Sequence, residues 1–142
     1  MQTILGSSGI IGIEVAKELH RSYTKDIRLV SRDPKKVNPT DQLFKADLLN
    51  RDQVMEAVKG SDVVYLTVGI QYNVRLWAEQ WPVIMRNVIA ACKEHKAKLV
   101  FFDNVYSYGK VDGRMPERPL RSLEIRPLPI TRSGICLQTE MP

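Results

Sequence analysis

Apolar residues recur along the chain with two different periods, and the changes between them predict its strands and helices. A short apolar run at residues 3–5 predicts a first strand. After it, Ile11, Val15 and Leu19 follow one another at a spacing of four residues, which predicts a helix with these side chains on its buried stripe. Residues 27–30 form a second apolar run and predict the next strand.

The middle of the chain continues the alternation. We expect a third strand over residues 42–46 and a helix over residues 51–59, with Asn50 as its N-cap and Gly60 as its stop. Residues 62–69 are apolar and β-branched almost throughout. Such a run predicts a strand that is buried on both faces, as in a parallel sheet covered by helices.

A long helix and a last strand complete the pattern. The helix is expected over residues 78–95, with Pro82 within its first turns, and residues 99–102 predict the strand. The buried side of the helix is expected to carry Ile84, Val88 and Ala91. Alternating strands and helices predict an α/β fold, a Rossmann-type doubly wound parallel sheet of about five strands in the order 3-2-1-4-5.

Three evenly spaced glycines lie between the first strand and the first helix. In such a turn the first glycine lets the chain reverse, the second lets the backbone approach a pyrophosphate, and the third lets the helix pack on the sheet. The helix then presents its amide N–H groups and the positive end of its dipole to an anion. The turn therefore predicts a nucleotide phosphate site formed by Gly6, Ser8, Gly9, Ile10, Ile11 and Gly12.

The second strand ends in Ser31 and Arg32, about twenty residues beyond Gly12, where a dinucleotide fold meets the adenosine ribose. A carboxylate at this place binds the ribose hydroxyls and favours NAD. Ser31 and Arg32 instead offer hydrogen-bond donors and a positive charge to a 2′-phosphate. These residues favour NADP over NAD as the cofactor, and the alternative is a solvated arginine at a strand end.

Composition excludes several classes of protein. The length of 142 residues is that of one domain, and no apolar run or amino-terminal pattern suggests a membrane span or a signal peptide, so we expect a cytoplasmic protein. Cys92 and Cys136 are too few for a disulfide framework, and His20 and His95 give no metal-ligand spacing, so no metal site is expected. Basic residues are mixed with acids rather than gathered in a patch, so no nucleic-acid binding is expected, and the net charge of +5 fits an anionic ligand equally well.

Four further segments share a pattern with a known family. They are residues 46–48 after the third strand, 67–69 after the fourth strand, 87–92 in the long helix, and 101–109 after the last strand. Together with the glycines, these segments resemble the extended and atypical branch of the short-chain dehydrogenase/reductase superfamily, the NAD(P)-dependent epimerase/dehydratase-like proteins. The resemblance runs from Met1 to about Gly113.

The resemblance implies roles for four residues of the cofactor site. Asp47 would bond the adenine amino group, Leu48 would lie beside the adenine ring, and Val68 and Gly69 would line the cofactor's ribose. A capping or loop carboxylate is the alternative for Asp47.

The resemblance also implies hydride transfer assisted by a tyrosine, a lysine that lowers the pKa of this tyrosine, and a serine or threonine that holds the substrate oxygen. The serine position is occupied by Asn104, which can bond a carbonyl but cannot relay a proton. Tyr106 and Lys110 have the family's spacing, but they directly follow a strand and enclose Gly109, so a loop need not bring them together. Both an enzyme and a non-catalytic NADP-binding sensor therefore remain open.

The composition changes after Lys110. Residues 111–142 contain no lysine, five arginines and five of the eight prolines. We expect an NAD(P)-binding Rossmann domain over residues 1–110 and an irregular Pro/Arg-rich tail over residues 111–142. The tail is interpreted either as a non-native or truncated continuation, which leaves the sheet carboxyl-terminally incomplete, or as a Pro-rich loop with a short edge strand. An incomplete sheet has open edges, so self-association is expected.

Overall fold

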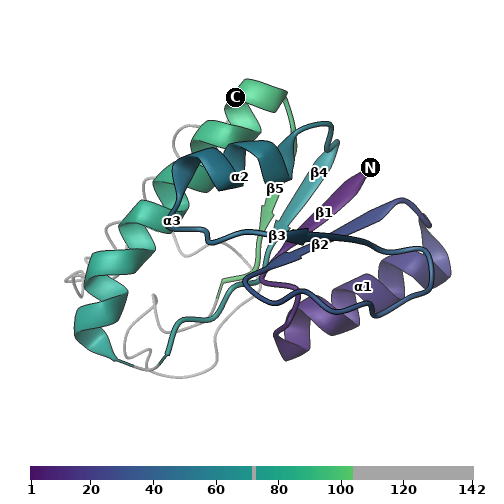
Figure 1. The fold of residues 1–142 in the computed structure, drawn as a ribbon, viewed down its shortest axis with the longest axis horizontal. Helices are drawn as coiled ribbons and strands as arrows, with labels where there is room; N and C mark the ends of the chain where they lie inside the picture. The colour runs from purple at the N-terminus through teal and green to yellow at the C-terminus, as the bar shows by residue number, and fades with distance from the viewer. Residues whose placement is uncertain (72, 104–142) are drawn as a thin grey trace, which may run out of the picture. The chain divides into compact units, whose positions relative to one another are not determined.

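The structure, a computed structural model, describes residues 1–71 and 73–103, which form a five-stranded parallel sheet with helices on both faces (Figure 1). The strand order is β3-β2-β1-β4-β5, and each neighbouring pair is parallel. This confirms the predicted fold class and strand order. The elements are β1 (Gln2–Leu5), α1 (Ile10–Ser22), β2 (Ile27–Ser31), β3 (Gln42–Lys45), α2 (Arg51–Val58), β4 (Val63–Leu66), α3 (Val74–His95) and β5 (Lys98–Phe101).

Two helical layers enclose the sheet. Helix α1 lies on one face, and α2 and α3 pack against each other on the opposite face (Figure 1). The chain winds first one way from β1 through α1 to β2, and then back across the sheet to β4 and β5. Right-handed crossovers in opposite directions place their helices on opposite faces. The central strand β1 is buried on both faces, and its Thr3, Ile4 and Leu5 have no exposed surface.

The buried stripe of α1 differs from the prediction. Gly12, Ala16 and Leu19 are buried and Val15 is half-buried, whereas Ile11 is 37% exposed. The helix turns its glycine toward the sheet because this allows the closest approach. Hydrophobic periodicity overlooks a glycine, which is why the sequence placed Ile11 on the buried stripe.

Strand β4 is less buried than predicted, and β5 is also partly exposed. Val64 and Leu66 are buried, but Val63 and Tyr65 are only half-buried, and Val100 of β5 is 38% exposed. The reason is the placement of α1, which packs over β1 and β2. Within residues 1–71 and 73–103, the contacts of α1 with the sheet are concentrated on β1 and β2, although Tyr65 of β4 still packs against the core cluster that includes Ala16 and Leu19.

Helix α2 begins as predicted after Asn50, whose side-chain oxygen accepts the backbone N–H groups of Asp52 at 3.0 Å and Gln53 at 3.1 Å. This satisfies two amides that have no partner within the helix. The helix ends at Val58, one residue before the predicted end. Gly60 then turns the chain with a φ of 76°.

Helix α3 begins four residues before the predicted start. The side chain of Asn73 accepts the backbone N–H groups of Arg75 and Leu76 and caps the helix there. Pro82 consequently lies inside the helix rather than in its first turns. Ile84, Val88 and Ala91 are buried as predicted.

Candidate functional site

A cleft of about 770 Å³ lies where the strands β1 to β4 end. Its walls are formed by residues 6–9 after β1, 31–33 and 35–37 after β2, 46–49 after β3, and 68–70 after β4. Ile13 and Lys17 of α1 and Gln80 and Ile84 of α3 complete the lining. Open parallel sheets bind their ligands at the carboxyl ends of the strands, and this cleft occupies that position.

Most of the residues singled out from the sequence line this cleft. They are Gly6, Ser8, Gly9, Ser31, Arg32, Asp47, Leu48, Val68 and Gly69. Ile10, Ile11 and Gly12 do not line it and instead form the first turn of α1. Asn104, Tyr106 and Lys110 lie outside the described residues.

Gly6 and Gly12 are required by packing. Gly6 has a φ of 93°, and a Cβ there would lie 2.6 Å from the Cα and N atoms of Val68. A Cβ on Gly12 would lie 2.7 Å from the carbonyl oxygen of Gly6 and 2.8 Å from Cα of Ser7. These contacts are with backbone atoms, which cannot move aside as a flexible side chain can. The two glycines therefore hold α1 close against the ends of β1 and β4.

Gly9 faces open space. A Cβ at this position would meet a single neighbouring atom within 4 Å, the carbonyl oxygen of Gly6 at 3.5 Å. Packing within the described residues therefore does not require a glycine here. Binding of a bulky ligand at the mouth of α1 would require a glycine here, because a side chain at residue 9 would occupy the space that the ligand needs.

The amino terminus of α1 is open. Gly9 is its N-cap and provides no side-chain hydrogen bond, the first turn contains no acidic residue, and the first helical bond runs from Ile13 N–H to the Gly9 carbonyl at 3.0 Å. The amides of Ile10, Ile11 and Gly12 therefore have no acceptor within the helix. With the positive end of the helix dipole, they form a site that fits a diphosphate.

Two serines between the glycines have different environments. The Ser8 hydroxyl lies 2.8 Å from Oγ of Ser31 and 3.1 Å from the carbonyl oxygen of Asp33, and so joins the glycine turn to the end of β2. Ser7 lines the cleft and is only 2% exposed, and its Oγ has no partner among the described residues. A buried hydroxyl without a partner is uncommon and indicates a place for an ordered water or a ligand. Ser7 was not among the site residues predicted from the sequence, although its place between two glycines was a usable signal.

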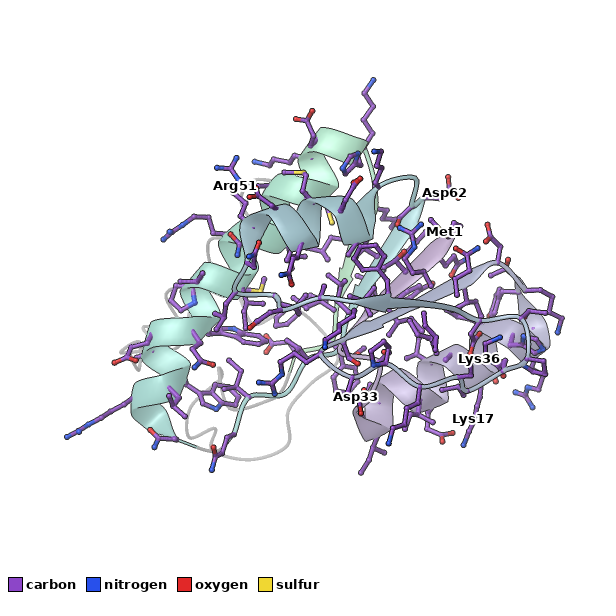
Figure 2. The ribbon with its side chains drawn as sticks, in the orientation of Figure 1. Met1, Lys17, Asp33, Lys36, Arg51 and Asp62 are labelled. Atoms are coloured by element: carbon purple, nitrogen blue, oxygen red, sulfur yellow. The ribbon has the colours of Figure 1, made fainter. Side chains whose placement is uncertain are left out.

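Basic side chains line one side of the cleft. Arg32, Lys35 and Lys36 come from the segment after β2, and Lys17 comes from α1. Figure 2 shows Lys17, Lys36 and Asp33 in the part of the view that α1 occupies. Lys17 Nζ lies 2.7 Å from a carboxylate oxygen of Glu14, and Lys35 Nζ lies 4.0 Å from one of Asp33. Exposed pairs of this kind contribute little free energy, so this side of the cleft keeps its attraction for an anion.

The loop after β3 has its own internal hydrogen bonds. Asp47 accepts the N–H of Leu49 through Oδ1 at 3.0 Å, as the loop-carboxylate interpretation expects. Asn87 of α3 is buried, and its side-chain nitrogen donates to the carbonyl oxygens of Leu48 at 2.9 Å and Leu49 at 3.2 Å. Asn87 thereby fixes this wall of the cleft. Asn87 was named from the sequence only as part of the segment 87–92 that carries the family resemblance, and no role was predicted for it.

The fold and the cleft together define a Rossmann-like dinucleotide-binding domain. The sheet order, the site at the carboxyl ends of the strands, and the glycine turn that leads into an uncapped helix are all present. A family model described as NAD(P)H-binding matches residues 6–123, and the chain belongs to this family. The comparison with curated protein sequences gave no significant match.

Solved structures share the fold. A Rossmann-fold NAD(P)-binding family protein from Shigella flexneri is 27% identical, with a TM-score of 0.57 over 69% of this chain and 48% of that chain. Uronate dehydrogenase from Agrobacterium tumefaciens is 19% identical, with a TM-score of 0.69 over 84% of this chain and 47% of that chain, and a variant of it has been solved with NAD. An NADPH-dependent quinone oxidoreductase from Escherichia coli is 22% identical, with a TM-score of 0.52 over 71% of this chain and 34% of that chain.

These comparisons confirm the resemblance at the level of an NAD(P)-binding Rossmann-like family with dehydrogenases and reductases among its structural neighbours. The chain spans about half or less of the length of the three solved structures. In the part of the chain that the structure describes, no helix is long and apolar enough to span a membrane. The same residues contain no group of His, Cys, Asp and Glu side chains that could hold a metal ion.

Proposed function

We propose that the chain binds NADP in the cleft and is the cofactor-binding domain of an oxidoreductase of the epimerase/dehydratase type. The reaction would be hydride transfer on a hydroxyl or carbonyl substrate. One observation carries the proposal: the uncapped amino terminus of α1 opens beside a cleft in which Gly9 leaves space for a ligand. In this proposal the amides of Ile10, Ile11 and Gly12 hold the diphosphate.

The residues that line the cleft suggest where the adenine and a ribose of the cofactor would lie. Leu48 would lie beside the adenine, and Asp47 would accept a hydrogen bond from the adenine amino group while Oδ1 keeps its bond to Leu49. Val68 and Gly69, at the end of β4, would line a ribose. Space at Gly69 supports this part of the proposal, because an added Cβ would meet no atom of the described residues within 4 Å.

The preference for NADP rests on charge. Arg32, Lys35 and Lys36 all line the side of the cleft next to the end of β2, where the adenosine ribose is expected. Charge-assisted hydrogen bonds from such groups to a phosphate are among the stronger interactions of proteins. The hydroxyls of Ser8 and Ser31 lie beside them and add hydrogen-bonding capacity.

The nicotinamide ring, when bound, supplies or accepts the hydride. In the proposed reaction, Asn104 donates its side-chain amide N–H to the substrate oxygen, and the Tyr106 hydroxyl exchanges a proton with that oxygen. The ammonium group of Lys110 stabilises the Tyr106 phenolate. As part of the same proposal, residues 1–110 form the cofactor domain and residues 111–142 form a separate tail. We also propose that the protein is cytoplasmic and that it self-associates.

A non-catalytic NADP-binding sensor is the second candidate. It is favoured by the sequence after Lys110, because residues 111–142 contain neither a tyrosine nor a lysine that could form the family's catalytic pair. Both candidates use the same cofactor site. Hydride transfer to or from a bound substrate supports the enzyme, whereas NADPH binding without any turnover supports the sensor.

Arg32→Asp is expected to reverse the cofactor preference. Loss of the positive charge removes attraction for a 2′-phosphate, and the new carboxylate can accept hydrogen bonds from ribose hydroxyls. We expect NADPH affinity to fall by about tenfold or more, while NADH affinity is kept or rises. Titrations followed by nicotinamide fluorescence measure both, with Arg32→Lys as the control that keeps the charge. An unchanged ratio of the two affinities in Arg32→Asp contradicts the assignment.

A further inference from the structure

The segment between β2 and β3 carries two of the cleft's lysines without any helix or strand to hold them. This segment, residues 32–41, is called the basic loop here, and it places Lys35 and Lys36 at the cleft. Lys36 Nζ donates to the carbonyl oxygen of Pro39 at 3.0 Å, within the loop itself. An irregular loop keeps a fixed path only where its own side chains or its neighbours bind its backbone.

One carboxylate binds the backbone of the basic loop. Asp41 is only 3% exposed, and its Oδ2 accepts the N–H of Val37 at 3.1 Å and the N–H of Asn38 at 2.6 Å. Its Oδ1 accepts the side-chain N–H of Asn38 at 3.2 Å. Hydrogen bonds to a charged and buried acceptor are the stronger ones, so these bonds fix the chain immediately after the two lysines.

A second contact joins the loop to α1. The side-chain nitrogen of Asn38 also donates to the carbonyl oxygen of Ala16 at 3.1 Å. Val37 packs against the core cluster that includes Ala16 and Leu19. Asp41 and Asn38 thus fasten the basic loop to the helix whose amino terminus opens on the cleft.

We infer that Asp41 is a positioning residue for cofactor selectivity, because it holds Lys35 and Lys36 where they reach the phosphate that distinguishes NADP from NAD. This inference rests on the proposed function, since it assumes that the adenosine end of the cofactor lies beside the basic loop. Asp41 does not touch the cofactor and acts through the backbone that precedes it.

The test compares two cofactors rather than stability alone. In Asp41→Ala the amides of Val37 and Asn38 lose their acceptor, and we expect NADPH affinity to fall by about tenfold while NADH affinity changes by less than about twofold. Asp41→Asn retains one acceptor oxygen and is expected to give an intermediate loss. Asn38→Ala removes the bond to Ala16 and serves as a milder second variant should Asp41→Ala fail to fold; it too is expected to weaken NADPH selectively.

A double variant shows whether Asp41 acts through the lysines. When Lys35 and Lys36 are both replaced by alanine, adding Asp41→Ala is expected to cause no further loss of NADPH affinity. Equal weakening of NADPH and NADH, or a full additional loss in the lysine-free background, overturns the inference. The affinities of the native chain for NADPH and NADH are measured before any variant is made. If they show no preference for NADPH, the proposed function fails rather than the inference about Asp41.

Discussion

Adding one carbon atom at Gly12 is expected to destabilise the domain by about 2 kcal/mol or more. In Gly12→Ala the new Cβ would lie 2.7 Å from the Gly6 carbonyl oxygen and 2.8 Å from Cα of Ser7, both in the backbone. Relieving the contacts requires α1 to move away from the sheet. Alanine is otherwise favoured over glycine in a helix by about 1 kcal/mol, so any loss of stability comes from the clash. Urea unfolding followed by circular dichroism measures the change.

Gly69→Ala is the matched control for Gly12→Ala. It adds the same carbon at another glycine of the cleft, where no atom of residues 1–71 or 73–103 lies within 4 Å of the new atom. We expect its free energy of unfolding to stay within about 0.5 kcal/mol of the native value. If Gly12→Ala is as stable as Gly69→Ala, the close packing of α1 against the glycine turn described above is contradicted.

Gly9→Val is expected to weaken cofactor binding strongly and leave the domain folded. Among the described residues its Cβ meets a single atom, at 3.5 Å, so the isopropyl group occupies the open space at the mouth of α1. The cost to folding is expected to be about 1 kcal/mol, because valine is a poorer N-cap than glycine. The diphosphate, however, can no longer reach the amides of the first turn, and we expect NADPH affinity to fall by about a hundredfold or more. Calorimetric titration measures the affinity, and thermal unfolding checks the fold.

Gly9→Ala gives a graded comparison, since a methyl group fills less of the same space. Its loss of affinity is expected to lie between those of the native chain and Gly9→Val. Native-like NADPH affinity in a folded Gly9→Val protein excludes this end of α1 as the cofactor site. Variants of Gly9 therefore test the space for the ligand, and variants of Gly12 test the packing of α1. The spacing of the glycines alone does not distinguish these two requirements.

Much of the fold could be predicted because strands and helices leave periodic patterns in the sequence. The strand order and the Asn50 cap of α2 were predicted and confirmed. Errors arose where the decisive residue has no apolar side chain. Gly12 rather than Ile11 faces the sheet, and Asn73 starts α3 early enough to place Pro82 inside it.

The candidate site was predictable only at the ends of its strands. The glycine turn and Arg32 could be located because they follow apolar runs directly, and Arg32 and residues 6–9 of the turn line the cleft. Lys35 and Lys36 could not be assigned, since they belong to a loop without periodicity. The path of this loop depends on a buried carboxylate, Asp41, which in the sequence looks like an ordinary turn residue.

The central claim is that main-chain amides at the start of α1 hold the diphosphate of the cofactor, and amide NMR spectra of the isotopically labelled chain test it most directly. During titration with NADPH, we predict that the amide protons of Ile10, Ile11 and Gly12 show the largest downfield shifts, as expected when an N–H begins to donate to a phosphate oxygen. Unchanged amide resonances at these three residues in the presence of saturating NADPH, or no binding of NADPH at all, would contradict the claim.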